Sequence, residues 1–497
     1  MSKHVVIIGS GLGGLTCGYI LAKNGYRVSI LEKNAQLGGC LQTFTRHGVK
    51  FETGMHYIGS MEEGERLHRF FNYLSLLPDI QIQSLDKAAY DVISIGGQRF
   101  PYANGIENFI DSLASSFPRE RQNLQNYWRH IREIVDSSPL YSAQYTGSAQ
   151  LFNPFARQSA SGFIESITNN KLLQSVLAGN APIYAGVKDK TSLYLLALTN
   201  DFYNRSAYRI IGGSDRIAQS LIQSIRSLDG TVRASSEVTH IHCDSHRATS
   251  VTINHTEELQ GDYFISNIHP VRMVGLLNTP LIRKAYRERI LHLRNTISNF
   301  TVYILFRKNT VPYLNSNLYH YNTMEDVWKE RDYSPDAWPD SFLYMHLCSS
   351  AGQTYAEAAI LMTYMNYEEV ESWAGTSVGR RGEAYEKFKQ EKAERLLNLL
   401  EKQAPGTKEN IERYYTSSPL TYADYTGTEK GSLYGILHDC TDPVQTMVFP
   451  RTKIPNLFQT GQNINSHGII GVIIGSILTS GEITGVNTIL KQISEVE

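Results

Sequence analysis

The chain has 497 residues and a formal net charge of −1, because 47 Lys and Arg stand against 48 Asp and Glu. Hydrophobic residues make up 41% and charged residues 19%, which excludes a disordered or collagen-like chain. This length allows about two to four domain-sized units. The near-neutral charge argues against a partner held by bulk attraction to phosphates, so no nucleic acid is expected.

The five cysteines are widely scattered and show no metal-ligand spacing, so no metal site is predicted. A sparse, odd number of cysteines fits a reducing compartment. The apolar run Val5–Ile8 is too short for a signal sequence, and Gly and Ser interrupt the apolar stretch at 463–481. We therefore expect a cytoplasmic protein with no spanning helix, and the oligomeric state stays open.

The first 32 residues predict a strand, a Gly-rich turn, a helix and a second strand that ends at Glu32. Glycines in such a turn permit a tight bend, a close approach to a pyrophosphate and close packing of helix on strand. The helix N-terminus offers free N–H groups to the phosphates. The Glu32 carboxylate can accept from ribose hydroxyls and disfavours a 2′-phosphate, which indicates FAD or NAD. The predicted contacts here are Gly9, Ser10, Gly11, Gly13, Gly14 and Glu32.

A second glycine pair, Gly38-Gly39, follows within one short loop and leads to Thr43. This GG-x-x-x-T step resembles the second fingerprint of the flavoprotein group that includes amine oxidases and phytoene desaturases. That group usually has Arg after the glycine pair, whereas this chain has Cys40, a change that removes one phosphate donor. The resemblance implies non-covalent FAD and further cofactor contacts at Lys33, Gly38, Gly39, Thr43, Gly54 and Met55.

Two later segments resemble the remaining FAD-binding parts of the same group. The mid-chain segment contributes Val238, expected beside the adenine, and Asn267 at the end of GDYFISN. The C-terminal segment contributes Gly461, Gln462, Gly468 and Ile469. The resemblance implies an α/β fold, a Rossmann-like FAD domain of the glutathione-reductase type interleaved with an α+β substrate domain. The FAD domain is predicted from 1–74, 205–275 and 416–497, and the substrate domain from 75–204 and 276–415.

The string Gly54-Met55-His56-Tyr57-Ile58-Gly59 narrows the resemblance to the retinol saturase branch of the phytoene desaturase and carotenoid isomerase group. This branch implies an FAD-dependent enzyme that reduces a carbon–carbon double bond of a hydrophobic polyene or isoprenoid lipid. Such a reduction needs a proton as well as a hydride, and His56 and Tyr57 are the candidate catalytic donors. The alternative is that His56 only packs at the flavin edge.

Other functions of the same scaffold stay open. They are a carotenoid or phytoene desaturase or isomerase, an amine oxidase-like flavoenzyme, and a flavin-free chaperone of prenyl lipids such as the Rab GDP-dissociation inhibitors. No second complete G-x-G-x-x-G is present, so either NAD(P)H binds transiently or a partner delivers the electrons. The resemblance also implies that the tunnel mouth touches the inner face of a membrane peripherally, without a spanning segment.

Overall fold

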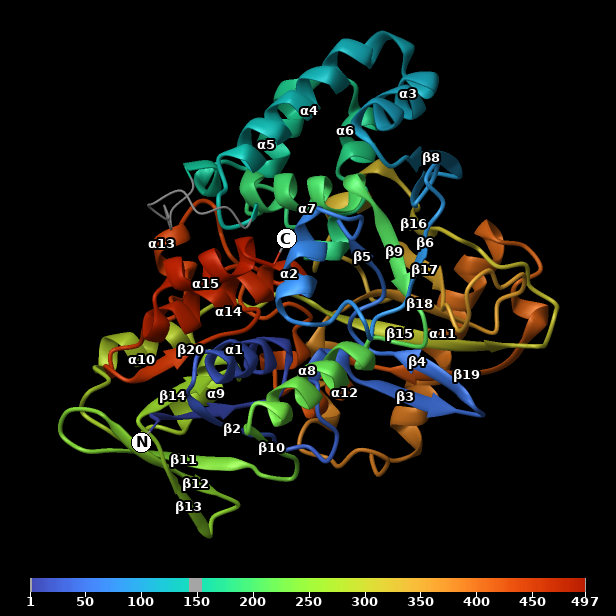
Figure 1. Ribbon diagram of the computed structural model, residues 1–497. Helices are drawn as coiled ribbons and strands as arrows, with labels where there is room; N and C mark the ends of the chain where they lie inside the picture. The colour runs from blue at the N-terminus through green and yellow to red at the C-terminus, as the bar shows by residue number, and fades with distance from the viewer. Residues whose placement is uncertain (1, 143–153, 497) are drawn as a thin grey trace.

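The computed structural model describes residues 2–142 and 154–496, and its centre is a five-stranded parallel sheet (Figure 1). The strand order is β10-β2-β1-β14-β20. These strands are β1 (His4–Ile8), β2 (Arg27–Leu31), β10 (Thr231–Arg233), β14 (Tyr263–Ser266) and β20 (Leu457–Gln459). Three stretches of sequence therefore build one sheet, and they lie side by side in blue, green and red in Figure 1.

Both faces of this sheet are covered, as expected for parallel strands rich in Val and Ile. Val5 and Ile7 belong to the core shared with three helices. Val6 and Ile8 pack on the opposite side, in the core of a three-stranded sheet. The helices are α1 (Leu12–Lys23), α8 (Asp215–Ser227) and α14 (Gly468–Thr484), and the small sheet is β11 (Val238–Cys243), β12 (Ala248–Ile253) and β13 (Glu257–Gln260). The predicted α/β dinucleotide fold is confirmed.

A second, seven-stranded sheet has the order β19-β15-β18-β17-β16-β7-β8. Only the β16–β7 pair is parallel, so this sheet is almost entirely antiparallel. The long helix α11 (Glu383–Gln403) packs in the core on one of its faces. The strands are β7 (Asp91–Ile95), β8 (Gln98–Tyr102), β15 (Ser298–Phe306), β16 (Asn317–Tyr321), β17 (Ser341–His346), β18 (Ala358–Met365) and β19 (Ile411–Ser417).

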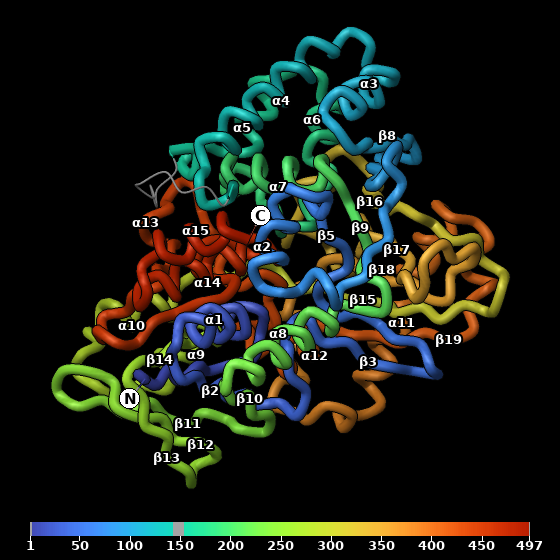
Figure 2. The backbone as a smooth tube through the Cα atoms, viewed as in Figure 1, coloured from blue at the N-terminus to red at the C-terminus, as the bar shows by residue number. Residues whose placement is uncertain are grey.

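A lobe of helices stands beyond the edge of the seven-stranded sheet, as Figure 2 shows at the top of the molecule. The helices of this lobe are α3 (Ile106–Ser116), α4 (Arg121–Asp136), α5 (Ala160–Ile167), α6 (Lys171–Leu177) and α7 (Leu193–Arg205). The remaining helices are α2 (Arg66–Tyr73), α9 (Pro270–Gly275), α10 (Lys284–Leu291), α12 (Pro419–Thr426), α13 (Pro443–Thr446) and α15 (Val486–Ser494).

Two further small sheets are separate from the large ones. One is the hairpin of β3 (Thr43–Arg46) and β4 (Val49–Glu52), and the other has the order β5-β9-β6, beginning with β5 (Ile58–Gly59). In the latter sheet β9 (Ala207–Ile210) pairs with β6 (Ile82–Ser84). Strand β9 lies in a segment predicted to belong to the FAD domain, whereas β6 lies in a segment predicted to belong to the substrate domain. Strand β19 likewise crosses the domain boundary predicted at 416. The substrate-domain segment 75–204 includes 143–153, which lie outside the described residues.

The apolar C-terminal stretch forms the buried helix α14. Its small residues allow close packing, and a Cβ on Gly481 would lie 2.4 Å from the side chain of Val486 at the start of α15. Over residues 2–142 and 154–496, no helix has both the length and the hydrophobicity needed to cross a bilayer.

Candidate active site

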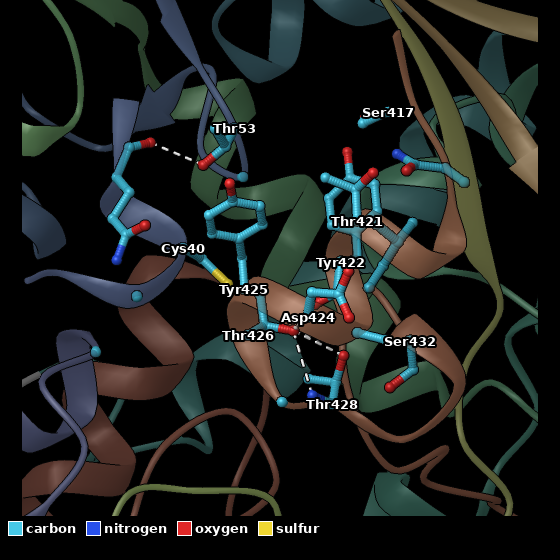
Figure 3. Close-up of a pocket in the computed structure, with 18 of the residues that line it drawn as sticks. Cys40, Thr53, Ser417, Thr421, Tyr422, Asp424, Tyr425, Thr426, Thr428 and Ser432 are labelled. Atoms are coloured by element: carbon cyan, nitrogen blue, oxygen red, sulfur yellow. Dashed lines mark hydrogen bonds between the residues drawn. The ribbon is translucent and has the colours of Figure 1, made fainter. Parts of the chain in front are cut away.

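A cavity of about 1730 Å³ lies between the two large sheets. Pockets for single small ligands hold about 300–1,000 Å³, so this cavity has room for a dinucleotide and a substrate together. Its walls come from the Gly-rich turn, the 38–57 segment, one face of the seven-stranded sheet and the N-terminus of α14. One part of the lining is polar: Figure 3 shows hydroxyl residues of α12 and of the following loop to one side of Cys40.

The cavity collects nearly all of the residues predicted to contact the cofactor or the substrate. Only Ser10, Gly14 and Gly38 of that set do not line it. The binding and catalytic roles of the predicted residues remain predictions, but the fold brings most of these residues together around one cavity. The members that line it are Gly9, Gly11, Gly13, Glu32, Lys33, Gly39, Thr43, Gly54, Met55, His56, Tyr57, Val238, Asn267, Gly461, Gln462, Gly468 and Ile469.

Three backbone segments meet at the Gly-rich turn with no space for side chains. A Cβ on Gly13 would lie 2.6 Å from Asn267 Oδ1 and 2.8 Å from the Gly461 backbone. A Cβ on Gly39 would lie 2.8 Å from Gly11 Cα. Because the turn also begins α1, it forms a bare backbone cradle at a helix N-terminus, which is the geometry that a diphosphate needs. The residues present therefore fit the diphosphate of FAD.

Residues behind the cradle hold its shape. A Cβ on Gly14 would lie 2.1 Å from Gly9 O, so helix and strand pack at backbone distance. The Ser10 hydroxyl donates to Glu32 Oε2 at 2.9 Å and accepts from the Gly38 N–H at 3.1 Å. Ser10, Gly14 and Gly38 therefore support the turn from outside the cavity.

Glu32 is buried at the end of β2, and protein N–H and O–H groups orient its carboxylate. Oε2 accepts from the backbone and hydroxyl of Ser10, and Oε1 accepts from the Asn34 N–H, all at 2.9 Å. A carboxylate has about four acceptor positions, so one stays available toward the cavity. This arrangement suits a ribose hydroxyl as the fourth partner.

His56 lines the cavity and faces a buried carboxylate. Its Nδ1 lies 3.8 Å from Glu52 Oε2, and 11% of its side chain is exposed. Nδ1 is buried without a hydrogen-bond partner among the described residues, and His56 is part of the cavity lining. Burial raises the pKa of Glu52, and the facing His56 opposes that rise. The ring can therefore present a proton at Nε2 while Glu52 balances charge at Nδ1.

Tyr57 also lines the cavity, but its hydroxyl points away from it. The Tyr57 hydroxyl donates to Asp91 Oδ2 at 3.2 Å and lies 2.7 Å from the Tyr319 hydroxyl. Asp91 and Tyr319 are fully buried and do not line the cavity. Burial raises the pKa of Asp91 to about 7, so this carboxyl is about half protonated at neutral pH.

A buried guanidinium links these two acids. Arg209 is 1% exposed, and it donates to the His56 carbonyl at 3.4 Å and to Asn317 Oδ1 at 2.7 Å. The Asn317 side-chain amide in turn donates a hydrogen bond to Asp91 Oδ1 at 2.7 Å. The positive charge of Arg209 lowers the pKa of both Glu52 and Asp91, against the larger effect of burial.

Sequence reasoning missed Glu52, Asp91 and Arg209. Glu52 lies four residues before His56, so the spacing could have indicated a partner. Asp91 and Arg209 carry no such signal, because they come from β7 and β9, and only the folded chain brings them together.

The second arm of the cavity is mainly apolar. The seven-stranded sheet contributes Leu343, Met345 and Met362 to its lining. On the side of α14, the ring of Tyr434 stacks on His467 with centroids 4.3 Å apart. Burial lowers the pKa of His467 to about 3, so this ring is neutral and serves packing rather than proton donation at neutral pH.

Cys40 occupies the position where the resembling flavoproteins carry Arg. It is open to the cavity, and desolvation by the surrounding protein raises the pKa of its thiol. The group is therefore a neutral thiol and adds no positive charge beside the diphosphate cradle. Among the described residues, no three His, Cys, Asp or Glu side chains group as a metal site.

The fold and the cradle define a flavin-dependent oxidoreductase. The family model of flavin containing amine oxidoreductases matches residues 12–483, and the chain belongs to this family. It is therefore an FAD-dependent oxidoreductase of the amine oxidase and carotenoid desaturase superfamily.

Individual relatives divide between the branches of this superfamily. Human all-trans-retinol 13,14-reductase is 28% identical over 96% of this chain and 85% of its own length. A 4,4'-diapophytoene desaturase of Methylomonas sp. is 25% identical over 61% of each chain. The structure of cyclohexylamine oxidase from Brevibacterium oxydans matches with a TM-score of 0.62 at 13% identity, covering 99% of this chain and 100% of that chain. The last likeness concerns the fold alone.

Proposed function

We propose that this protein is a retinol saturase-like reductase, which adds two hydrogens across a carbon–carbon double bond of a hydrophobic polyene or isoprenoid lipid. The observation that carries the proposal is the position of His56, a ring in the cavity lining whose Nδ1 faces the buried Glu52 carboxylate at 3.8 Å. The similarity to all-trans-retinol 13,14-reductase supports it.

When bound, FAD supplies hydride chemistry. The chain has three tasks of its own. The Gly-rich cradle and Glu32 bind and orient the dinucleotide, and the apolar sheet face positions the alkene and excludes water. His56 Nε2 gives a proton to the substrate carbon next to the one that receives the hydride, and Glu52 stabilises the charged form of the ring. Tyr57 holds Asp91 beneath this site.

An anaerobic half-reaction tests the proposal. The FAD-loaded protein is reduced chemically and mixed with all-trans-retinol or a carotenoid, and the return of oxidised flavin absorbance is followed. In a parallel experiment the oxidised protein is mixed with a carotenoid or an amine, and the loss of that absorbance is followed. We expect reoxidation by a polyene and a product heavier by two hydrogens. Desaturation by the oxidised form would instead support the desaturase, amine oxidation the amine oxidase, and a colourless protein that does not take up FAD the lipid chaperone.

The electron donor in this proposal is NAD(P)H bound transiently or a protein partner. Rapid mixing of oxidised protein with NADPH distinguishes them, because a direct donor bleaches the flavin without added protein. The lipid-like substrate, a cytoplasmic location and peripheral membrane contact belong to the same proposal. Flotation with anionic vesicles tests the membrane contact.

His56→Gln should slow alkene-dependent flavin reoxidation by about 100-fold to 10,000-fold, the usual contribution of a general acid. Stopped-flow absorbance measures this rate, and FAD content should not change. His240→Gln is the matched control, because His240 lies on β11 outside the cavity lining. A normal rate in His56→Gln would remove His56 from the chemistry and leave it as a packing residue at the flavin edge.

A further inference from the structure

A buried acid, Asp91, is held beneath the cavity and takes no part in the proposed chemistry. It lies on β7, is 0% exposed and does not line the cavity. Its Oδ2 accepts from the Tyr57 hydroxyl at 3.2 Å, and its Oδ1 accepts from the Asn317 amide at 2.7 Å. Because the carboxylate is separated from the cavity, any role of Asp91 in the reaction must act through other residues.

Two routes connect Asp91 to the cavity residues His56 and Tyr57. The first is the direct hydrogen bond from the Tyr57 hydroxyl. On the second route Asn317 Oδ1 accepts from Arg209 at 2.7 Å, and Arg209 also donates to the His56 carbonyl at 3.4 Å. The Asp91 carboxylate is therefore only one amide away from the guanidinium that touches the backbone of His56.

Four side chains of this cluster can carry a charge, and they are Glu52, His56, Asp91 and Arg209. The guanidinium of Arg209 is always charged, and a buried charge without a counter-charge is costly. When His56 is neutral, one ionised acid is enough to balance Arg209. When His56 is protonated, both acids must be ionised to keep the cluster neutral. The charge state of Asp91 therefore affects how easily His56 holds a proton.

The other titratable groups that face this cluster stay neutral at neutral pH. Burial lowers the pKa of His346 to about 3, raises the pKa of Tyr313 to about 12 and raises the pKa of the Cys348 thiol. Burial also raises the pKa of each phenol near the Asp91 charge well above its ordinary value of 10, and these phenols are Tyr57, Tyr90, Tyr102, Tyr203 and Tyr319. Among the described residues, the charge balance therefore depends on the two acids, His56 and Arg209.

We propose that Asp91 is a positioning residue for the proton donor: in its ionised form it balances Arg209, so that His56 can hold its proton. This inference rests on the proposed function, in which His56 gives a proton to the substrate. The coupling is reciprocal, since a proton on His56 favours ionisation of Asp91 to the same extent. Tyr57 and Asn317 hold the carboxylate in place for this task.

The pH range in which Asp91 changes its charge suits this role. Burial raises its pKa to about 7, against the hydrogen bonds from Asn317 and Tyr57 and the charge of Arg209. A carboxyl with the ordinary pKa of about 3.9 would stay ionised throughout the neutral range. Asp91 instead gains and loses its charge near neutral pH, where a histidine can act as a proton donor.

Asp91→Asn should move the pH dependence of alkene reduction without lowering its maximum. The amide cannot ionise, so the protonated ring of His56 loses a counter-charge and gives up its proton at lower pH. The pH at which the rate is half-maximal should therefore fall by about one unit. Stopped-flow reoxidation of the reduced, FAD-loaded protein by all-trans-retinol measures this profile. A merely structural role of Asp91 would instead lower the rate equally at every pH.

NMR of the His56 ring tests the coupling without any turnover. Histidine labelled with carbon-13 gives one Cε1 signal for each ring, and His56→Gln identifies the signal of His56. In the oxidised, FAD-loaded protein this signal should titrate about one pH unit lower in Asp91→Asn than in the wild type. Asp326→Asn is the matched control, because Asp326 is also buried, at 4% exposed, but lies outside the cavity lining. It should leave the titration unchanged.

The double variant Asp91→Asn, Asn317→Asp exchanges the two side chains and provides a rescue. It returns one carboxylate to the cluster, at the position that Arg209 already contacts at 2.7 Å. The counter-charge is thereby restored next to the guanidinium. The His56 signal should again titrate at the wild-type pH or above it, and the rate profile should move back in the same direction.

The outcomes separate this inference from the proposed function. An unchanged titration of His56 in Asp91→Asn would overturn the inference and leave Asp91 as a structural acid, whether or not the protein reduces an alkene. A folded double variant that titrates like Asp91→Asn would also overturn it. If no polyene is saturated while the His56 signal still shifts and is rescued, the reductase fails and the coupling stands.

Discussion

Gly13→Val should abolish stable FAD binding, with a loss of affinity of at least about 100-fold, equivalent to about 2.7 kcal/mol. The Cβ alone would lie 2.8 Å from the backbone nitrogen and Cα of Gly461, and backbone cannot rotate away as a side-chain end can. The added methyl groups would also fill the space at the start of α1 where the diphosphate is expected. Flavin absorbance per polypeptide after purification, and fluorescence titration with FAD, measure the loss.

Gly162→Ala provides the control for this substitution. Gly162 lies inside α5, where an added Cβ would meet only Ser159 at ordinary contact distances of 3.6 Å and more. Alanine favours helix over glycine, so this variant should fold and keep its flavin. Full FAD content in Gly13→Val would show that the diphosphate does not use the cradle.

Asp91→Asn should change how stability depends on pH. The pKa of Asp91 in the folded protein is raised to about 7 by burial, against about 3.9 in an unfolded chain. The folded state therefore holds an extra proton between these values, and the wild type loses stability as pH rises from about 4 to 7. The loss is on the order of 4 kcal/mol. The introduced amide resembles the protonated acid and cannot ionise. The free energy of unfolding of the variant should therefore rise relative to that of the wild type as pH increases from about 4 to 7.

Urea unfolding of both proteins at several pH values measures the difference. Asp244→Asn is the control with the opposite sign. Asp244 is fully exposed, and backbone N–H groups of His246 and Arg247 lower its pKa. The free energy of unfolding of the wild type should therefore rise relative to that of Asp244→Asn as pH rises. A pH-independent difference for Asp91→Asn would mean that Asp91 is ionised throughout and stores no proton beneath Tyr57.

The cofactor half of the site is predictable from the sequence because its signals are local. The turn from Gly9 to Gly14 and the acid Glu32 lie within one strand–helix–strand unit. Within such a unit the spacing along the sequence determines where each residue lies in space. The Gly38-Gly39 loop and the C-terminal segment needed the resemblance to a family, because a glycine pair alone indicates only a turn. The structure then places these segments around one cavity.

The substrate half is not predictable in this way. Leu343 and Met362 of the apolar wall lie on different strands and meet only through the register of β17 and β18. Asp91, Arg209 and Asn317 come from three different strands. A polar residue on a mainly apolar strand looks the same in sequence whether it faces solvent, a core or a cavity. Its chemistry depends on long-range pairing that no single window contains.

The interleaved parallel sheet has a consequence for how the protein is made. Strand β1 pairs with β2 almost at once, but its other neighbour, β14, begins only at Tyr263. The edge strand β20 and the helix α14 are synthesised later still, and only α15 follows them among the described elements. Such distant pairings close large loops and fold slowly. The nascent chain must therefore keep the apolar flanks of β1 and α1 from aggregating until almost the whole polypeptide has left the ribosome.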